Sequence, residues 1–435
     1  MSRLLVCFVL CGVASARADL LTYVQKPDAS FAWKVVKQTN LKEGTLWQIE
    51  LTSQTWQKIP WTHDLVVALP KDAKPTSTML LYNTGGRANA ANMVLQLELA
   101  KRIQAPVAFL FGIPKQPLFD GKKEDALIAE TFVRYLDTKD ADWPLLFPMV
   151  KSLVKAMDAL QAFAKEQWKT ELTGFVVSGA SKRGWTSWLT GAADKRVKAI
   201  MPLVIDTLNF QKQMPYQLKS YGAYSEQIKD YTERKLVPMP DTPEAKRLWS
   251  WVDPWVYRDR LTMPKLILNG TNDPYWTQDA LNLYWDDLRG PKWVSYVPNA
   301  GHGLEEVLPD GSKNRDRAIS VMAAFAGMII HERTPPQITW TIKDNQIRVE
   351  ADPKPSVVRL WETSAATRDF RRSTWKPATL QAKEINSPVT FTVEKPSKGS
   401  KAFFVEVGYG QGDQAYAFST QIHILDAPKT EKGDK

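Results

Sequence analysis

The chain has 435 residues, of which 44% are hydrophobic and 24% charged, so it is long and apolar enough to bury a large core. Its formal charge is +10, but the basic residues are scattered and follow no aromatic RNA-binding pattern or zinc-finger spacing, so nucleic-acid binding is not expected. Both cysteines, Cys7 and Cys11, lie near the N-terminus, so the rest of the chain has no disulfide, thiolate metal site or cysteine nucleophile.

The first eighteen residues have the pattern of a signal peptide. Arg3 is followed by an apolar run over residues 4–13, and the sequence ARA at 16–18 fits a cleavage site. The run is shorter than the ~20 residues that a membrane span needs, so we expect cleavage before Asp19 and no transmembrane segment afterwards. Cleavage removes Arg3 and Arg17 and lowers the formal charge from +10 to +8. A cysteine-free exported chain of this length suits a bacterial periplasm or the cell exterior.

Residues 19–334 predict an α/β domain. Short apolar runs predict buried strands at 79–83, 106–111, 174–178, 199–205, 265–269 and 293–297. Longer segments between them predict helices at 88–102, 149–166, 182–193, 277–288 and 314–330. Alternation of helices with nearly continuous apolar strands predicts a mostly parallel sheet that is covered on both faces.

Two long insertions and a change of period divide the rest of the chain. The insertions, at about 114–148 and 208–262, either form a cap over a site or add surface helices. After residue 334, apolar residues alternate with polar ones along short segments, which predicts an antiparallel β-sandwich of fibronectin or immunoglobulin type over 335–425. The charged residues 426–435 are expected to form a disordered tail.

The stretch FVVSGASKRGW at residues 175–185 indicates a nucleophile elbow, the sharp turn between a strand and a helix that exposes a serine. The usual pattern is G-x-S-x-G. Gly179 lies two places before Ser181, but Arg183 occupies the place of the second glycine and Gly184 follows one position later. Small residues are needed because the strand and the helix pass closely, and we expect Gly184 to meet that need. The alternative is a serine that only caps a helix.

A serine nucleophile needs a base, and the base needs a carboxylate that orients it. His302 lies in PNAGHG directly after the strand predicted at 293–297, and Asp273 lies in NGTNDP directly after the strand predicted at 265–269. The order Ser, Asp, His, with each residue after a strand, is the α/β-hydrolase order. Asp206, after the preceding strand, is the alternative acid. The remaining histidines are expected to be structural: His63, His331 and His423.

Backbone amides that can bind an oxyanion are expected at two places. One is the N–H of Lys182, directly after the serine, and the other is the loop that contains Gly85 and Gly86. Arg183 is expected either to contact the oxyanion or an anionic substrate, or to turn away and pair with an acid of the sheet edge. No metal cluster, phosphate loop or dinucleotide fingerprint stands out, so we expect no cofactor and no metal.

Three segments together resemble the PhoPQ-activated pathogenicity-related proteins, the PqaA-type family of the α/β-hydrolase superfamily. They are SGASKRGWTSWLTGAAD at 178–194, LILNGTNDPYWTQDALNLYWDDLRGPKWV at 266–294 and YVPNAGHGL at 296–304. The resemblance covers nearly all of the chain after residue 18. It implies an exported α/β-hydrolase with a nucleophile at Ser181, an acid at Asp273 and a base at His302, and the family name implies a link to PhoPQ-type virulence. The Ser-x-Arg-Gly form of the elbow is also similar to that of glucuronoyl esterases.

The sequence therefore predicts an exported serine hydrolase that acts through an acyl-enzyme on a peptide or a small ester. For a peptide, Glu226 and Asp230 in the second insertion are candidates to hold an amine; for an acidic-sugar ester, Arg183 is the candidate to bind the carboxylate. The family's link to antimicrobial-peptide defence favours a peptide. The alternatives are a glucuronoyl-esterase-like carbohydrate esterase and a non-catalytic envelope binding protein that keeps the hydrolase fold.

Overall fold

The computed structural model describes residues 19–308, 310–381, 385 and 388–428. The predicted signal peptide, with both cysteines, and residues 429–435 of the predicted tail lie outside the described residues. Among the helices of the described part, none combines the length and the apolar character that crossing a membrane requires.

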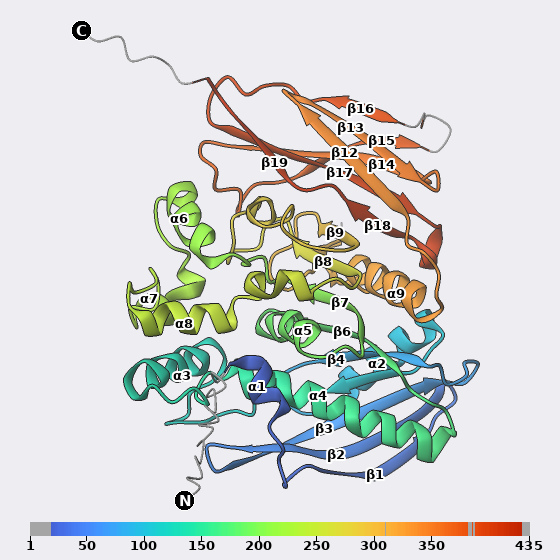
Figure 1. The fold of residues 1–435 in the computed structure, drawn as a ribbon. Coiled ribbons are helices and arrows are strands. Elements are labelled where there is room, and N and C mark those ends of the chain that lie inside the picture. The colour runs from blue at the N-terminus through green and yellow to red at the C-terminus, as the bar shows by residue number, and fades with distance from the viewer. Residues whose placement is uncertain (1–18, 309, 382–384, 386–387, 429–435) are drawn as a thin grey trace, which may run out of the picture.

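A large mixed sheet forms the centre of the molecule (Figure 1). The strands β4 to β9 pair in parallel in the order β5-β4-β6-β7-β8-β9. Their bounds are β4 (Thr78–Asn83), β5 (Val107–Leu110), β6 (Gly174–Ala180), β7 (Val197–Leu203), β8 (Lys265–Gly270) and β9 (Lys292–Val297). This arrangement confirms the predicted α/β fold with a mostly parallel sheet.

Three antiparallel strands extend the sheet beyond β5 and were absent from the sequence prediction. They are β1 (Ala32–Asn40), β2 (Gly44–Trp56) and β3 (Ile59–Pro70), and β3 runs antiparallel to β5. Most of β1 is exposed. The strand therefore has no continuous apolar run of the kind that identified the central strands.

The two faces of the sheet belong to separate cores. Leu81 and Val177 face a core that includes α4 (Leu146–Phe163) and α5 (Lys182–Ala193), whereas Leu80 and Val176 face a core that includes the helices α2 (Ala90–Ile103) and α9 (Asp316–Ile330). Successive side chains of a strand point to opposite faces. Because both faces are covered, consecutive residues must both be apolar, which explains the unbroken apolar runs of the sequence.

The prediction of a helix at 277–288 is wrong. This segment consists of turns and the short 3-10 helix Ala280–Leu283. Its polar side chains bind loops between the C-terminal strands instead: Asn282 donates to the carbonyl of Ile422, and Gln278 accepts from the N–H of Phe370. These tertiary contacts override the helical pattern of the sequence.

The two insertions supply helices on one side of the molecule (Figure 1). The first insertion contributes α3 (Glu124–Thr138). The second contributes α6 (Phe210–Tyr221), α7 (Lys229–Thr232) and α8 (Pro243–Val252), and α3 contacts both α7 and α8. The short helix α1 (Leu20–Gln25) contacts α4 and α5, and a hairpin of β10 (Glu306–Val307) and β11 (Lys313–Asn314) precedes α9.

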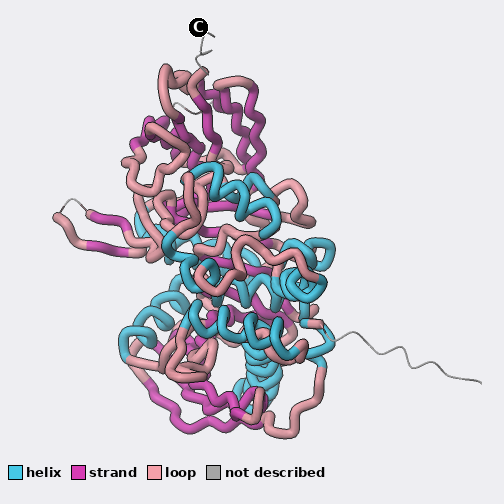
Figure 2. The backbone as a smooth tube through the Cα atoms, turned by 90° about the vertical axis from the view of Figure 1, so that its left-hand side faces the viewer, coloured by secondary structure: helices cyan, strands magenta, loops and turns pink. Residues whose placement is uncertain are grey.

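The C-terminal strands form two antiparallel sheets, and Figure 2 shows only strands and loops in this upper part of the molecule. One sheet holds β12 (Gln337–Lys343), β13 (Gln346–Asp352) and β16 (Val389–Thr392). The other holds β14 (Val357–Ala365), β15 (Lys376–Gln381), β17 (Ser400–Tyr409), β18 (Tyr416–Ser419) and β19 (His423–Asp426). Valines from both sheets, Val349, Val358 and Val407, are buried in one core. The strands β14 and β15 were absent from the prediction. The domain boundary expected at residue 334 stays a prediction.

The second C-terminal sheet continues the central sheet, because Ser419 of β18 pairs with Val294 of β9. A buried carboxylate adds a polar link at this junction. Glu406 of β17 accepts from Arg317 of α9 at 2.7 Å and from Arg359 of β14 at 2.6 Å. The C-terminal strands are therefore joined to the central α/β part by main-chain pairing and by an ion-pair network.

Candidate active site

Ser181 occupies a strained turn between β6 and α5. Its φ of 59° and ψ of −127° lie outside the regions that a non-glycine residue normally adopts. The structure thus has the elbow geometry that the stretch SGASKRG predicts. Ser181 Oγ makes no hydrogen bond within the described residues, and its side chain lines a cavity.

Both flanking glycines are needed for this turn. A Cβ on Gly184 would lie 2.8 Å from Ile205 Cγ2 and 2.9 Å from the carbonyl oxygens of Gly179 and Leu203. A Cβ on Gly179 would lie 2.8 Å from the carbonyl oxygen of Arg183. The displaced glycine at 184 therefore meets the steric demand of the second glycine in the usual pattern.

Asp273 and His302 meet at the carboxyl ends of β8 and β9. His302 Nδ1 lies 2.8 Å from Asp273 Oδ2, and Asp273 is 4% exposed. His302 Nε2 is buried and has no hydrogen-bond partner within the described residues. The ring of Tyr275 stacks on the imidazole at a centroid distance of 4.2 Å. The carboxylate and the stacked ring fix the imidazole and leave Nε2 available to accept a proton.

The alternative acid, Asp206, binds other partners and makes no hydrogen bond to His302 within the described residues. Its carboxyl accepts from Tyr284 Oη at 2.6 Å and from Asn269 Nδ2 at 3.0 Å. Burial raises the pKa of Asp206 to about 7, although the hydrogen bond from Tyr284 lowers it. Asp206 therefore belongs to a buried hydrogen-bonded cluster beneath the site.

The other histidines bind structural partners. His63 is buried, where its Nδ1 pairs with the carbonyl of Phe111 and its Nε2 with Ser53 Oγ, and burial lowers its pKa to about 4. His331 Nε2 pairs with the carbonyl of Ile103 at 2.8 Å. The ring of His423 packs on Phe403 of β17. The expectation that these three residues are structural agrees with their contacts.

Backbone donors lie on both sides of the elbow. The N–H groups of Lys182, Gly85 and Gly86 have no hydrogen-bond partner within the described residues. Gly86 has a φ of 68°, which favours glycine, and an added Cβ there would meet open space. These amides are the candidates to bind a developing oxyanion.

Arg183 turns away from the cavity and binds the first insertion, so its acidic partner lies at the start of α3 and not at the sheet edge, as one expectation had it. Its Nη1 and Nη2 donate to the two carboxylate oxygens of Glu124 at 2.7 and 2.8 Å, and its Nε donates to the carbonyl of Ile113 at 2.5 Å. The guanidinium lies against Gly85, where a Cβ would collide with it. In this arrangement Arg183 joins the elbow, the glycine loop and α3, while a contact with substrate stays a prediction.

Glu124 also holds the side chain of Lys182, whose Nζ lies 2.9 Å from Glu124 Oε2 and 3.1 Å from Asp125 Oδ2. Burial raises the pKa of Glu124, but the hydrogen bonds and charges of Arg183 and Lys182 outweigh it and lower the pKa to about 2. Glu124 itself has a φ of 51°. This strained residue at the start of α3 is therefore held by two cations.

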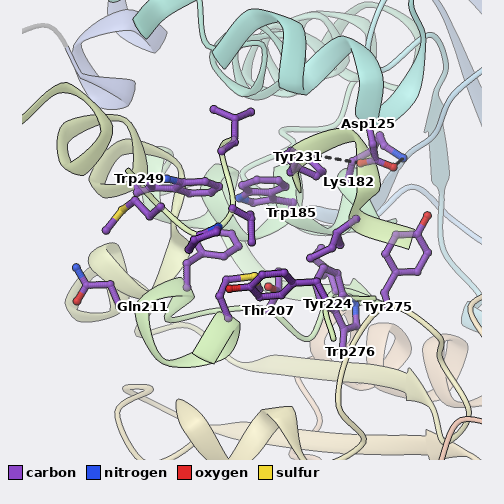
Figure 3. Close-up of a pocket in the computed structure, with 18 of the residues that line it drawn as sticks. Asp125, Lys182, Trp185, Thr207, Gln211, Tyr224, Tyr231, Trp249, Tyr275 and Trp276 are labelled. Atoms are coloured by element: carbon purple, nitrogen blue, oxygen red, sulfur yellow. Dashed lines mark hydrogen bonds and ion pairs between the residues drawn. The ribbon is translucent and has the colours of Figure 1, made fainter. Parts of the chain in front are cut away.

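A cavity of about 260 Å³ opens beside Ser181 (Figure 3). Its wall is mostly aromatic and aliphatic and comes from β6–α5 and from both insertions. Lys182 and Asp125 lie at one end and Trp249 at the other, with Trp185 between them. Glu226 and Asp230, the residues suggested to hold an amine, do not line this cavity.

A loop of the C-terminal sheets, residues 366–375 between β14 and β15, holds the acid loop and the histidine loop. Asn272, next to Asp273, donates from Nδ2 to the carbonyl of Ser373 at 2.7 Å. Asn299, three residues before His302, donates to the carbonyl of Trp375 at 3.0 Å and accepts from its N–H at 2.7 Å. The C-terminal sheets therefore help to position both loops.

Sequence reasoning missed several of these residues. Glu124 and Asp125 look like ordinary acidic residues in the first turn of a helix, where the helix dipole favours them. Tyr275 carries no motif, although its position two residues after Asp273 was a signal that could have been used. Within the described residues, no group of three His, Cys, Asp or Glu side chains is arranged to hold a metal ion.

Comparisons with known proteins match nearly the whole chain. The family model "PhoPQ-activated pathogenicity-related protein" matches residues 20–371. Autocrine proliferation repressor protein A of Dictyostelium discoideum is 31% identical over 477 residues, which cover 99% of this chain and 94% of that protein.

Solved structures give more distant matches. Acetyl xylan esterase 1 from a Thermoanaerobacterium species aligns with a TM-score of 0.47 and 14% identity, covering 65% of this chain and 86% of that one. A glucuronoyl esterase from Solibacter usitatus aligns with a TM-score of 0.38 and 12% identity, covering 62% and 82%.

Gly184→Ala is expected to lower the free energy of unfolding by about 1–3 kcal/mol, because the new Cβ overpacks the elbow against two carbonyl oxygens. Gly327→Ala is the matched control, since Gly327 is also helical and its nearest neighbour would lie 3.7 Å from the new Cβ. This control should be neutral or slightly stabilising. Urea denaturation measures both variants; equal stabilities would contradict the steric role of Gly184.

The raised pKa of Asp206 has a consequence for stability. Between about pH 4 and pH 7 the folded protein keeps the proton of Asp206 while the unfolded chain has lost it, so this group's contribution to stability falls as pH rises through that window. Asp206→Asn removes the titration. Its free energy of unfolding, relative to the parent protein, should therefore be higher at pH 7.5 than at pH 4.5. An equal difference in the free energy of unfolding between variant and parent protein at both pH values would refute a buried, protonated Asp206.

Proposed function

The chain belongs to the PhoPQ-activated pathogenicity-related protein family, and for this member we propose a serine hydrolase in which Ser181 is the nucleophile, His302 the general base and Asp273 the carboxylate that orients it. The observation that carries the proposal is the pairing of His302 with Asp273 while Nε2 stays free. The strained turn at Ser181, beside a largely apolar cavity, adds the nucleophile and a place for substrate.

In the proposed reaction Ser181 Oγ attacks the substrate carbonyl carbon while its proton passes to His302 Nε2. The tetrahedral oxyanion accepts hydrogen bonds from the N–H of Lys182 and from the loop of Gly85 and Gly86. Collapse of this intermediate breaks the bond to the leaving group, which takes the proton from His302 and leaves an acyl-serine. A water then gives its proton to His302 and attacks the acyl carbon, which releases the acid and restores Ser181.

The substrate proposed is an ester or a peptide. A sugar-acid ester of the glucuronoyl type would call on Arg183 to bind a carboxylate, but Glu124 already occupies that guanidinium through two hydrogen bonds. The second candidate function is binding without catalysis, because the name of the Dictyostelium relative describes a repressor of proliferation and not an enzyme. A link to PhoPQ-type regulation stays a prediction from the family name.

Ser181→Ala should abolish covalent labelling by a small fluorophosphonate probe and lower ester hydrolysis by a factor on the order of 10⁴ to 10⁶. The reason is that the proposed mechanism forms the acyl-enzyme on Ser181 Oγ, and the variant lacks this hydroxyl. Ser250→Ala is the control, since Ser250 lies on α8, outside the residues that line the cavity. Gel fluorescence measures labelling and a 4-nitrophenyl acetate assay measures turnover.

Two results would count against the proposed triad. Equal labelling of the parent protein and Ser181→Ala would show that Ser181 is not the nucleophile. Absence of both labelling and turnover in the well-folded parent protein would favour the binding function.

We also propose that the protein is exported after cleavage before Asp19. The support is the order of charge, apolar run and ARA at residues 3–18, together with the role of Asp19, whose side chain caps α1 by accepting from Thr22 N. Expression in a bacterium should yield periplasmic or secreted protein whose mass corresponds to a start at Asp19. Cytoplasmic protein that keeps residues 1–18 would contradict export.

A further inference from the structure

We propose that the cavity beside Ser181 is an acyl-binding pocket for a compact, uncharged and apolar acyl group. This inference rests on the proposed hydrolase function and names its substrate class more narrowly. It assigns to the cavity the part of the substrate that stays on Ser181 in the acyl-enzyme, whereas the leaving group lies outside the cavity.

The position of His302 indicates where the leaving group and the acyl group of the substrate lie. The leaving group must lie next to His302 Nε2, because that atom gives it a proton. Ser181 and Lys182 line the cavity, whereas His302 does not. Tyr275 connects His302 with the cavity, because its ring stacks on the imidazole and it lines the cavity together with Trp276. A carbonyl carbon at Ser181 Oγ therefore directs its leaving group toward His302 and its acyl chain into the cavity.

The charges of the wall favour an uncharged group. The acidic and basic side chains that line the cavity are Asp125 and Lys182, and they pair with each other at 3.1 Å. Asp125 also accepts from Tyr231 Oη, and Lys182 also binds Glu124. An ammonium or a carboxylate on the acyl chain would enter a mostly apolar space in which these charges are already paired, and such burial is costly.

The size of the cavity limits the length of the acyl group. Its volume is about 260 Å³, which is small beside the roughly 300–1,000 Å³ of typical small-molecule pockets. A hexanoyl or benzoyl group fits this space, and a long fatty acyl chain does not. Aromatic rings of the second insertion line the cavity away from Lys182, among them Trp249 of α8 and Phe210 of α6.

Matched 4-nitrophenyl esters test the charge and the size. The esters of hexanoic, 6-aminohexanoic and adipic acid differ in the charge at the chain end and little in length. We expect kcat/KM for the hexanoate to exceed that for each charged ester at least tenfold, and to exceed that for the hexadecanoate by a similar factor. A charged ester that reacts as fast as the hexanoate, or a hexadecanoate that does so, would overturn the inference.

Substitutions on α6 test whether the preference for the acyl group arises in the cavity. Met214 lines the cavity and is buried, whereas Leu218, one turn further along, is exposed. Met214→Trp should fill the space and lower kcat/KM at least tenfold for the hexanoate but less than threefold for the acetate. Leu218→Trp should leave both values unchanged. Met214→Ala enlarges the cavity and should raise kcat/KM for the decanoate relative to that for the hexanoate.

The fluorophosphonate probe separates failure of the pocket from failure of the proposed function. If the parent protein is labelled at Ser181 but Met214→Trp and Leu218→Trp affect the hexanoate alike, the acyl chain does not occupy the cavity and only the pocket assignment is wrong. If the folded parent protein is neither labelled nor active on any ester, the proposed hydrolase itself is wrong.

Discussion

The site depends on one strained backbone turn. Ser181 has a left-handed φ of 59°, a conformation that costs on the order of 1–3 kcal/mol and persists only where the surroundings enforce it. Gly179 and Gly184 let β6 and α5 approach closely enough, and Asn83 ties the two elements by donating to the carbonyls of Ser178 and Arg183. The serine is thereby directed away from the sheet and toward the cavity.

The residues around this turn come from four parts of the chain that are distant in sequence. Arg183 binds Glu124 of the first insertion, so α3 is fastened to the same helix that begins at the elbow. Asn272 and Asn299 bind the loop 366–375, so the C-terminal sheets hold the loops of Asp273 and His302. The central sheet alone would leave these loops with fewer constraints.

The helix α3 and the cavity are also linked through charge. Glu124 and Asp125 neutralise Lys182 and Arg183 at the start of α5, where two cations would otherwise oppose the positive end of the helix dipole. With these charges paired, the rest of the wall is mostly aromatic and aliphatic. The same ion pairs that fasten α3 therefore leave no unpaired charge among the side chains that line the space beside Ser181.

The sequence by itself determined the parallel sheet, the elbow at Ser181 and the order in which Asp273 and His302 follow it, because these features depend on local patterns: apolar runs, small residues and a strand before each loop. It could not place the exposed strand β1, which lacks such a run, and it mistook residues 277–288 for a helix. Tertiary structure alone decided that Arg183 binds Glu124, that Asp206 faces Tyr284, and that a C-terminal loop braces the site. The physical reason is that each of these contacts joins residues far apart in the chain, and a side chain's choice among several possible partners is settled only by the packing that brings one of them within hydrogen-bond distance.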